Sequence, residues 1–358
     1  MKEKHILFLA EYPNSHTIKE GMSQRMVAID DMFAHHLRKY LFVSYRFYFK
    51  MEKEVIDDQA IQYRCNLFLH FFIILRLLIS SKLIYIHSVL NALNLMPFFL
   101  LLPKNKILVL DIHGVVPEEQ KYLGNKFKGI LYGITEKYLF KRLAFAIAVT
   151  ERMIDHYKIK YPTHKVEMIS YPILPSNILE SVPAIESKEN QKITNIVYSG
   201  NLQSWQNIDL MLDVIKRNLS DMIHYTILTG SLDEMKSKLN SKGLGQSGHI
   251  TVLSVKPDEL GKYYLAANYG FVLRDNFIVN NVACPTKIIE YMRYGIIPII
   301  KSDEIGDFKA LGFDSLKVGD FNTSTIKPVK SEKNVEIIDS LLHKYKNINI
   351  KDLVLNKV

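Results

Sequence analysis

Short apolar segments alternate with helical patterns along most of this chain of 358 residues. The segments have the length and the β-branched or aromatic content of buried strands. They are His5–Ala10, Leu41–Phe49, Leu83–Ile86, Lys106–Asp111, Ala144–Val149 and Val166–Ser170 in the first half, and Asn195–Ser199, His224–Leu228, Ile250–Leu253, Tyr269–Leu273 and Ile296–Ile300 in the second. Strands that alternate with helices form parallel sheets joined by right-handed crossovers. The sequence therefore predicts an α/β protein.

The length of the chain favours two domains, because a single hydrophobic core rarely extends over more than about 250–300 residues. A stretch after Ser170 that is rich in Pro, Ser and Glu is typical of an interdomain linker. We expect a first Rossmann-like domain at 1–172, a linker at 173–192 and a second Rossmann-like domain at 193–330. A helix within 331–358 is expected to pack back toward the first domain.

Composition restricts the class of protein further. With 48% hydrophobic and 23% charged residues, the chain is globular rather than disordered. Its two cysteines, Cys65 and Cys284, are too few for a disulfide framework and lack the spacing of metal ligands. The apolar run in Met1–Ala10 is too short for a secretory signal, and Leu67–Leu102 is interrupted by charged residues and histidines. These features favour a cytoplasmic protein.

The net charge of +9 is concentrated in the first half of the chain. Residues 1–172 carry 24 Lys or Arg against 16 Asp or Glu, a balance of +8, whereas residues 173–358 carry 22 against 21, a balance of +1. A basic domain can meet nucleic acid, an anionic membrane surface or an anionic acceptor, and charge alone does not choose. No nucleic-acid reader motif is present, so nucleic acid is not expected as a partner.

One short segment, Cys284–Ile300, joins a loop, a helix and a strand in a way that suits a nucleotide. Pro285 and Thr286 are typical of the start of a helix, where free backbone N–H groups can hold an anion. Lys287 adds a positive charge at that end, and Glu290 follows about one turn later. The amides and Lys287 are expected to hold a diphosphate, and the Glu290 carboxylate to accept hydrogen bonds from ribose hydroxyls.

The pattern Pro-Thr-Lys-x-x-Glu-Tyr-Met-x-x-Gly, followed by Pro and a β-branched pair, resembles the donor-nucleotide motif of GT-B-fold glycosyltransferases of the retaining, family-4-like (group 1) type. The resemblance implies two Rossmann-like doubly wound domains facing a central cleft, with the acceptor on the N-terminal side and the nucleotide sugar on the C-terminal side. It implies a hexosyltransferase-type enzyme that moves a sugar from a nucleoside diphosphate sugar to a hydroxyl with retained configuration. The expected acceptor is a glycan or lipid-linked glycan in capsule, O-antigen or exopolysaccharide synthesis, and no metal or other cofactor is expected.

The resemblance also assigns donor-binding positions after the strand at 195–199. Gly200 would let the backbone approach a phosphate, unless it marks an ordinary strand-to-helix turn. Relatives commonly place an Arg and a Lys where this chain has Asn201 and Gln206. Without those two cations, Lys287 and Arg274 would neutralise the diphosphate. An alternative for Arg274 is a surface salt bridge with its neighbour Asp275.

A further departure lies at Val282, where many relatives carry a Glu that contacts the transferred sugar. Sugar recognition is then expected to use backbone groups or the side chains of Asn280 and Asn281. Two alternative functions stay open, the first of them because of this departure and the two missing cations. One is a glycosyltransferase-like subunit that binds without catalysis, and the other is a sugar-nucleotide epimerase on the same fold.

In the first half, Asp111, His113 and Glu118 lie at the end of a predicted strand and in the loop and helix start that follow. Two carboxylates and an imidazole can orient an acceptor hydroxyl or bind donor sugar hydroxyls. In the alternative interpretation, Asp111 caps a turn and His113 has a structural role. Arg25 is expected on a helix surface, with diphosphate or acceptor binding as the alternative.

Between Tyr122 and Arg142, apolar residues recur at helical spacing and are flanked by lysines. Since this helix belongs to an α/β unit, the apolar arc is expected to pack against the sheet. The flanking cations suit an anionic membrane surface, which would place the protein peripherally on the inner face of the cytoplasmic membrane; a merely solvated basic face is the alternative.

The chain lacks the phosphate loop of nucleotide hydrolases and the Gly-x-Gly-x-x-Gly loop of classical dehydrogenases. It also lacks the Asp-x-Asp motif, which holds the metal in the other major glycosyltransferase fold.

Overall fold

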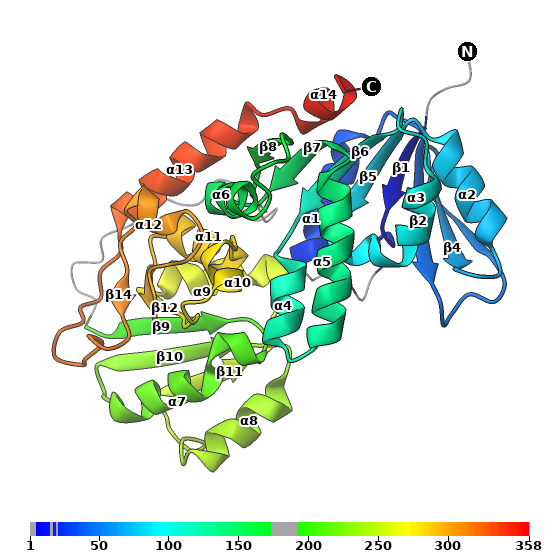
Figure 1. Ribbon diagram of the computed structural model, residues 1–358. Helices are drawn as coiled ribbons and strands as arrows, with labels where there is room; N and C mark the ends of the chain where they lie inside the picture. The colour runs from blue at the N-terminus through cyan, green and yellow to red at the C-terminus, as the bar shows by residue number, and fades with distance from the viewer. Residues whose placement is uncertain (1–4, 15–16, 19–20, 173–191, 358) are drawn as a thin grey trace. The chain divides into compact units, whose positions relative to one another are not determined.

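The computed structural model describes residues 5–14, 17–18, 21–172 and 192–357 (Figure 1). The chain divides into two compact units, the first formed by Met1–Ile173 with Ile348–Val358 and the second by Leu174–Asn347. Of the linker expected at 173–192, all but Lys192 lies outside the described residues.

The first unit is built on an eight-stranded sheet with the order β3-β4-β2-β1-β5-β6-β7-β8. Its strands are β1 (Ile6–Leu9), β2 (Arg38–Ser44), β3 (Glu52–Asp57), β4 (Ala60–Asn66), β5 (Leu83–His87), β6 (Ile107–Ile112), β7 (Leu143–Ala148) and β8 (Glu167–Ser170). Its helices are α1 (Gly21–Met32), α2 (Phe71–Ser80), α3 (Met96–Leu101), α4 (Val116–Tyr122), α5 (Lys126–Phe140), α6 (Glu151–Lys160) and α14 (Ile350–Leu355), with short 3₁₀ turns at Val89–Asn91 and Leu93–Leu95. All pairs are parallel except β3 with β4. The chain runs outward from β1 in both directions, which is the doubly wound arrangement that the alternation predicts.

The sequence did not predict the hairpin of β3 and β4. Apart from one bulge, β3 pairs antiparallel with β4, and its side chains are largely exposed, in keeping with its sequence Glu-Lys-Glu-Val-Ile-Asp. An edge strand with so many charges has no hydrophobic period for a pattern search to find. The strand expected at Leu41–Phe49 begins and ends earlier, at Arg38 and Ser44.

The second unit has a six-stranded sheet with the order β11-β10-β9-β12-β13-β14, and all its pairs are parallel. The strands are β9 (Thr194–Ser199), β10 (Ile223–Leu228), β11 (Ile250–Leu253), β12 (Tyr269–Val272), β13 (Ile297–Ile300) and β14 (Leu316–Lys317). The helices are α7 (Ile208–Arg217), α8 (Leu232–Ser241), α9 (Leu260–Ala266), α10 (Ile278–Asn281), α11 (Thr286–Arg293), α12 (Phe308–Leu311) and α13 (Glu332–Lys346), with 3₁₀ turns at Ser204–Gln206 and Pro257–Glu259.

Alternate residues of β9 contribute to two hydrophobic cores. Ile196 and Tyr198 pack with residues of α7 and α8, whereas Val197 packs with residues of α9, α11 and α13. The order of the chain reverses at β9, because β10 and β11 lie on one side of it and β12 to β14 on the other. The point between β9 and β12 is therefore the switch point of the sheet, where open α/β sheets bind ligands at the carboxyl ends of their strands.

Helix α11 has the ends that the sequence predicts. Pro285 is its N-cap, and Gly295 just beyond its C-terminus has φ 67°, a left-handed conformation that favours glycine. Its buried residue Tyr291 lies over Gly270 of β12, where an added Cβ would come within 2.3 Å of the ring. The absence of a side chain at Gly270 thus allows α11 to pack closely on the sheet.

The structure divides the C-terminal segment 331–358 between the two units. In α13, Ile338 belongs to the same core as α11 of the second unit, and the Ser331 side chain caps the helix by accepting a hydrogen bond from the N–H of Asn334. In α14, Ile350 and Val354 are buried in the core of the first unit. The single helix pattern expected here is thus two helices, one in each unit.

The apolar arc between Tyr122 and Arg142 does not pack against the sheet as the sequence predicts. Phe127, Ile130 and Ile134 of α5 are exposed, and the helix instead buries Glu136 and Leu139 among others. The expectation that the arc packs against the sheet is therefore wrong. Among the described residues, no helix is both long and apolar enough to cross a membrane.

Replacing Gly270 by Ala should destabilise the second unit by about 1–3 kcal/mol, because the rigid Tyr291 ring has to move away from the new methyl group. The change is measured as a shift of the thermal unfolding midpoint. Gly248→Ala is the matched control, since no atom lies within 4 Å of the added Cβ there. Equal midpoints for the two variants would contradict this account of α11 packing.

Candidate functional site

The predicted donor-binding residues of the second unit gather at the carboxyl ends of β9 and β12. Gly200 directly follows β9, Arg274 is the second residue after β12, and α11 begins at Thr286. This is the switch point of the sheet, so the strand order alone marks it as a ligand site.

Gly200 makes room for the side chain of Lys287. Gly200 has φ 147°, and a Cβ at this position would lie 3.0 Å from Lys287 Nζ. The ammonium group lies 4.0 Å from the ring centroid of Tyr198, a cation–π contact, and donates a hydrogen bond to Gln206 Oε1 at 3.1 Å. The sequence therefore places a glycine here for a local steric reason as well as for backbone freedom.

Two cations meet at this site. Burial, together with the charge of Arg274, lowers the pKa of Lys287 to about 7, and burial lowers the pKa of Arg274 to about 10. The Arg274 Nη1 group donates to Asn280 Oδ1 at 3.4 Å, whereas its Nε is buried and has no hydrogen-bond partner among the described residues. A bound anion would supply the missing acceptor and stabilise both charges.

The alternative salt bridge between Arg274 and Asp275 is replaced by other contacts of Asp275. Its carboxylate accepts hydrogen bonds from Asn207 Nδ2 at 2.9 Å and from Lys301 Nζ. Asn280 Nδ2 donates to the Asp275 carbonyl at 2.9 Å. The buried Asn280 side chain thus connects Arg274 to the backbone of Asp275 and positions the guanidinium, a role that the sequence did not indicate.

Glu290 is held at the same end of the sheet by Tyr264, and Tyr291 holds the neighbouring Ser199; the sequence predicts neither contact. Tyr264 Oη donates to Glu290 Oε2 at 3.0 Å and lies 2.6 Å from Ser199 Oγ. Tyr291 Oη accepts a hydrogen bond from the Ser199 N–H at 3.0 Å. Burial and the Glu290 charge raise the pKa of Tyr264 well above its usual value, so its hydroxyl stays protonated and can donate.

The positions that depart from the family pattern have different roles. Asn201 is exposed, and its Nδ2 donates to Gln203 Oε1 at 2.8 Å, whereas Gln206 is buried and accepts from Lys287. Val282 is also buried, at the end of α10. Gln206 therefore holds Lys287 by a hydrogen bond instead of adding a further cation, and Val282 offers no carboxylate.

In the first unit, Asp111 lies at the centre of a buried cluster. Arg25 Nη2 donates to Asp111 Oδ1 at 2.6 Å, and Arg25 Nη1 donates to the carbonyl of Tyr171 at 2.7 Å. Although burial alone would raise it, the charge of Arg25 and the neighbouring His113 hold the pKa of Asp111 well below its usual range. Arg25 is therefore a buried ion-pair partner, and both expectations for it, a surface residue or a ligand of diphosphate, are replaced.

His113 is brought next to Asp111, as the sequence predicts from their spacing. Its Nε2 lies 3.0 Å from Asp111 Oδ2, and its Nδ1 is buried without a hydrogen-bond partner among the described residues. His87, which pairs with Asp111 across β5 and β6, places its Nδ1 3.4 Å from the same oxygen. Burial lowers the pKa of His87, so its imidazole is neutral at pH 7.

These three residues form the one group among the described residues with the spacing of metal ligands, their candidate ligand atoms lying within 4.8 Å of one another. The buried Arg25 guanidinium already supplies positive charge to Asp111. A divalent cation would have to share that carboxylate with a second positive charge, which is costly in a buried site.

Glu118 belongs to a different cluster from His113. Its carboxylate lies 2.7 Å from Lys160 Nζ and 3.8 Å from His156 Nε2. Glu119 is the carboxylate closer to the loop, 4.0 Å from where a Cβ on Gly114 would lie. The structure thus joins Asp111 and His113 but places Glu118 apart from them.

No family model and no curated protein matches the sequence. Solved structures match over nearly the whole chain. A sucrose-phosphate synthase from Thermosynechococcus elongatus is 12% identical with a TM-score of 0.67, and covers 99% of this chain and 98% of its own. The lipopolysaccharide outer core galactosyltransferase WaaB is 14% identical with a TM-score of 0.66, over 99% of this chain and 100% of its own. Anabaena HepE in complex with UDP-glucose is 11% identical with a TM-score of 0.55, over 97% of this chain and 92% of its own.

At these identities the likeness establishes the fold. The chain has the two-domain GT-B fold, with one Rossmann-like doubly wound domain in each unit, and the predicted fold class is confirmed.

Replacing Arg25 by Met should destabilise the first unit by about 3–5 kcal/mol, because it leaves the buried Asp111 charge without its partner. The stabilisation belongs to the ionised carboxylate, whose folded-state pKa is depressed. This stabilisation is therefore fully present above about pH 4, the pKa of an ordinary carboxyl group. It is lost as the pH falls further, toward the depressed pKa of Asp111 in the folded protein. Denaturant unfolding at several pH values measures it.

The double variant Arg25→Met/Asp111→Asn should recover part of this stability, and Arg46→Met, which removes an exposed cation, should change little. Additive effects of Arg25→Met and Asp111→Asn would contradict the ion pair as the source of the stabilisation.

Proposed function

We propose that this protein is a glycosyltransferase that takes its sugar from a nucleoside diphosphate sugar. The observation that carries the proposal is the pair of cations, Lys287 and Arg274, at the switch point of the second unit with Glu290 about one turn along α11. Two buried cations at one site suit a diphosphate, and the nearby Glu290 carboxylate suits a ribose.

Each residue of this site has a definite role in the proposal. Lys287, Arg274 and the first N–H groups of α11, at Thr286 and Lys287, hold the diphosphate; Pro285 contributes no N–H but fixes the turn into the helix. Gly200 lets the phosphates approach the end of β9. These groups stabilise the negative charge that develops on the diphosphate as it leaves the sugar, which is the largest single contribution in many transferases.

The first unit would contribute the acceptor side. His113 Nε2 lies 3.0 Å from Asp111 Oδ2, and its buried ring nitrogens have no hydrogen-bond partner among the described residues, so the imidazole is free to bind a sugar hydroxyl. Asp111, ionised and paired with Arg25, positions this imidazole and does not itself exchange a proton. Glu118 has no place in this arrangement, because Lys160 holds it elsewhere.

We further infer retention of configuration and transfer without a metal ion, as the resemblance to the retaining family-4-like group implies. The acceptor we propose is a hydroxyl of a surface polysaccharide, and a lipid-linked one at the inner face of the cytoplasmic membrane is the form to test first. Uridine nucleotides are the first donors to test, since HepE was solved with UDP-glucose and TarM from S. aureus with UDP.

Replacing Glu290 by Ala should raise the KM for the donor by about tenfold or more, because ribose hydroxyls lose a charged hydrogen-bond acceptor, and leave the acceptor KM nearly unchanged. Initial rates of sugar transfer at varied donor and acceptor concentrations measure both. Glu234→Ala, at an exposed position of α8, is the control. Treatment with EDTA should leave the rate unchanged.

An unchanged donor KM would contradict the assignment of Glu290 to ribose binding. Donor binding without transfer to any acceptor in a broad panel would favour the binding subunit, and conversion of the free donor sugar without an acceptor would favour the epimerase.

Donor binding should weaken as the pH rises above about 7. The pKa of Lys287 is about 7 without ligand. A bound diphosphate favours the charged ammonium and raises the pKa of Lys287. At any pH between the pKa of the free protein and that of the complex, binding is therefore accompanied by uptake of a proton. The association constant should fall by about tenfold per pH unit in this range. Calorimetric titration of a nucleotide sugar between pH 6 and roughly 9 measures it.

Lys287→Arg is the matched variant, because its guanidinium stays charged throughout this pH range. Its association constant should therefore not change with pH. The same slope in the wild type and in this variant would contradict the role of Lys287.

A further inference from the structure

Large apolar side chains are exposed on three segments of the first unit. The segments are the loop after β2, the turn into α2 and the outer side of α5. The most exposed members are Phe49 (72%), Phe68 (73%), Phe72 (83%) and Phe127 (72%), joined by Phe47 and Ile130. We call these six residues the apolar face.

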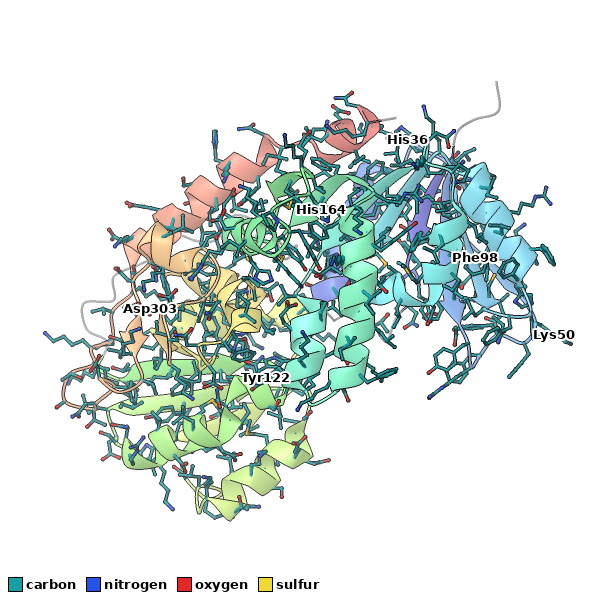
Figure 2. The ribbon with its side chains drawn as sticks, viewed as in Figure 1. His36, Lys50, Phe98, Tyr122, His164 and Asp303 are labelled. Carbon is teal, nitrogen blue, oxygen red and sulfur yellow. The ribbon has the colours of Figure 1, made fainter. Side chains whose placement is uncertain are left out.

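Side-chain contacts connect the three segments. Burial, together with nearby Tyr45 at the start of the loop, raises the pKa of Tyr132 on α5, so these two side chains lie close together. Asn66 at the end of β4 donates through Nδ2 to the carbonyl of Phe47 at 3.1 Å, and its Oδ1 accepts from the N–H of Phe68 at 3.0 Å. In Figure 2, Lys50 lies at the edge of the unit on this loop, and Tyr122 lies at the end of α4.

The loop after β2 is built to present its aromatic rings outward. Ser44 Oγ accepts hydrogen bonds from the N–H groups of Arg46 and Phe47, both at 3.2 Å. Tyr48 has φ 65°, a conformation that is rare for such a residue, and its hydroxyl donates inward to Glu11 at 3.4 Å. Phe47 and Phe49, on either side of it, are exposed.

The charges around the apolar face are mainly positive, although Glu52 and Glu54 of β3 follow the loop after β2 and are exposed. The sequence from Leu67 to Leu110 contains no Asp or Glu, and the one acid of α5, Glu136, is buried against Lys160. The cations on or next to the three segments are Arg46, Lys50, Arg76, Lys121, Lys126, Lys128 and Lys137. Exposed aromatic residues ringed by lysines match an anionic bilayer, in which rings enter the headgroup region and lysines meet the lipid phosphates.

We propose that the apolar face docks this protein onto an anionic lipid bilayer. The inference deepens the proposed function by naming the surface on which the acceptor is reached. Because β2, β4 and β6 run parallel, the segments after β2 and β4 lie on the same edge of the sheet as His113, which follows β6. A lipid-linked acceptor held at the bilayer would therefore approach the edge that carries the imidazole.

The test is co-sedimentation of the purified full chain with vesicles of phosphatidylcholine, alone or with roughly 30% phosphatidylglycerol. The wild type should bind the anionic vesicles at least about tenfold more strongly than the neutral ones, and less as salt is raised. The variant Phe49→Ser/Phe68→Ser/Phe127→Ser, one change in each segment, should lower the partition coefficient by about tenfold or more.

The matched control is Ile159→Ser/Met222→Ser/Val329→Ser, which removes three other exposed apolar side chains and should bind like the wild type. Thermal unfolding confirms that both variants fold. Failure of the wild type to bind anionic vesicles at low salt, or equal binding by the Phe variant, would overturn the proposal. A third outcome would also overturn it: a wild-type dimer that the Phe substitutions dissociate, with no binding to vesicles. The apolar face would then be a protein interface.

Calorimetric titration with UDP, on the same samples, separates this inference from the proposed function. Vesicle binding without nucleotide binding would refute only the donor site, and nucleotide binding without vesicle binding would refute only the docking surface.

Discussion

The candidate donor site depends on how closely helix α11 packs on its sheet. Gly270 leaves space for the Tyr291 ring, and the Tyr291 hydroxyl accepts a hydrogen bond from the N–H of Ser199 at the end of β9. These two contacts fix the helix against the carboxyl ends of β9 and β12. As a result Lys287 reaches the ring of Tyr198 beside Gly200, and Glu290 reaches Tyr264.

The buried arginines of the two units, Arg25 and Arg274, have different kinds of partner. In the first unit Arg25 is neutralised by Asp111, and the pair stabilises the fold and positions His113. In the second unit Arg274 lies near Lys287, and its described hydrogen-bond partner is the neutral amide of Asn280. A structural ion pair is complete in itself, whereas two adjacent cations are stabilised by a ligand. This contrast is the physical reason for placing the diphosphate in the second unit.

Sequence reasoning succeeded where the relevant contacts are local. The alternation of strands and helices predicts both sheets, and Pro285, Lys287 and Gly295 lie within one short segment that predicts its own helix and its ends. It failed where the partner is distant in the chain. Nothing near Arg25 indicates Asp111, 86 residues away.

Two further failures have the same origin. Tyr264 holds Glu290 from another helix, 26 residues earlier in the chain, so no local motif contains both. The apolar arc of α5 has the period of a buried helix, but α5 buries a different side that includes Glu136 and Leu139. Periodicity shows that a helix has an apolar face, and only the structure shows whether another element covers it.

The central claim is that Lys287, Arg274 and the start of α11 hold the diphosphate of the donor. A crystal structure of the protein with a bound nucleoside diphosphate tests it most directly. The account predicts phosphate oxygens within about 3.2 Å of Lys287 Nζ and of an Arg274 nitrogen, with ribose hydroxyls donating to the Glu290 carboxylate. A nucleotide bound elsewhere, with Lys287 still donating only to Gln206, would contradict it.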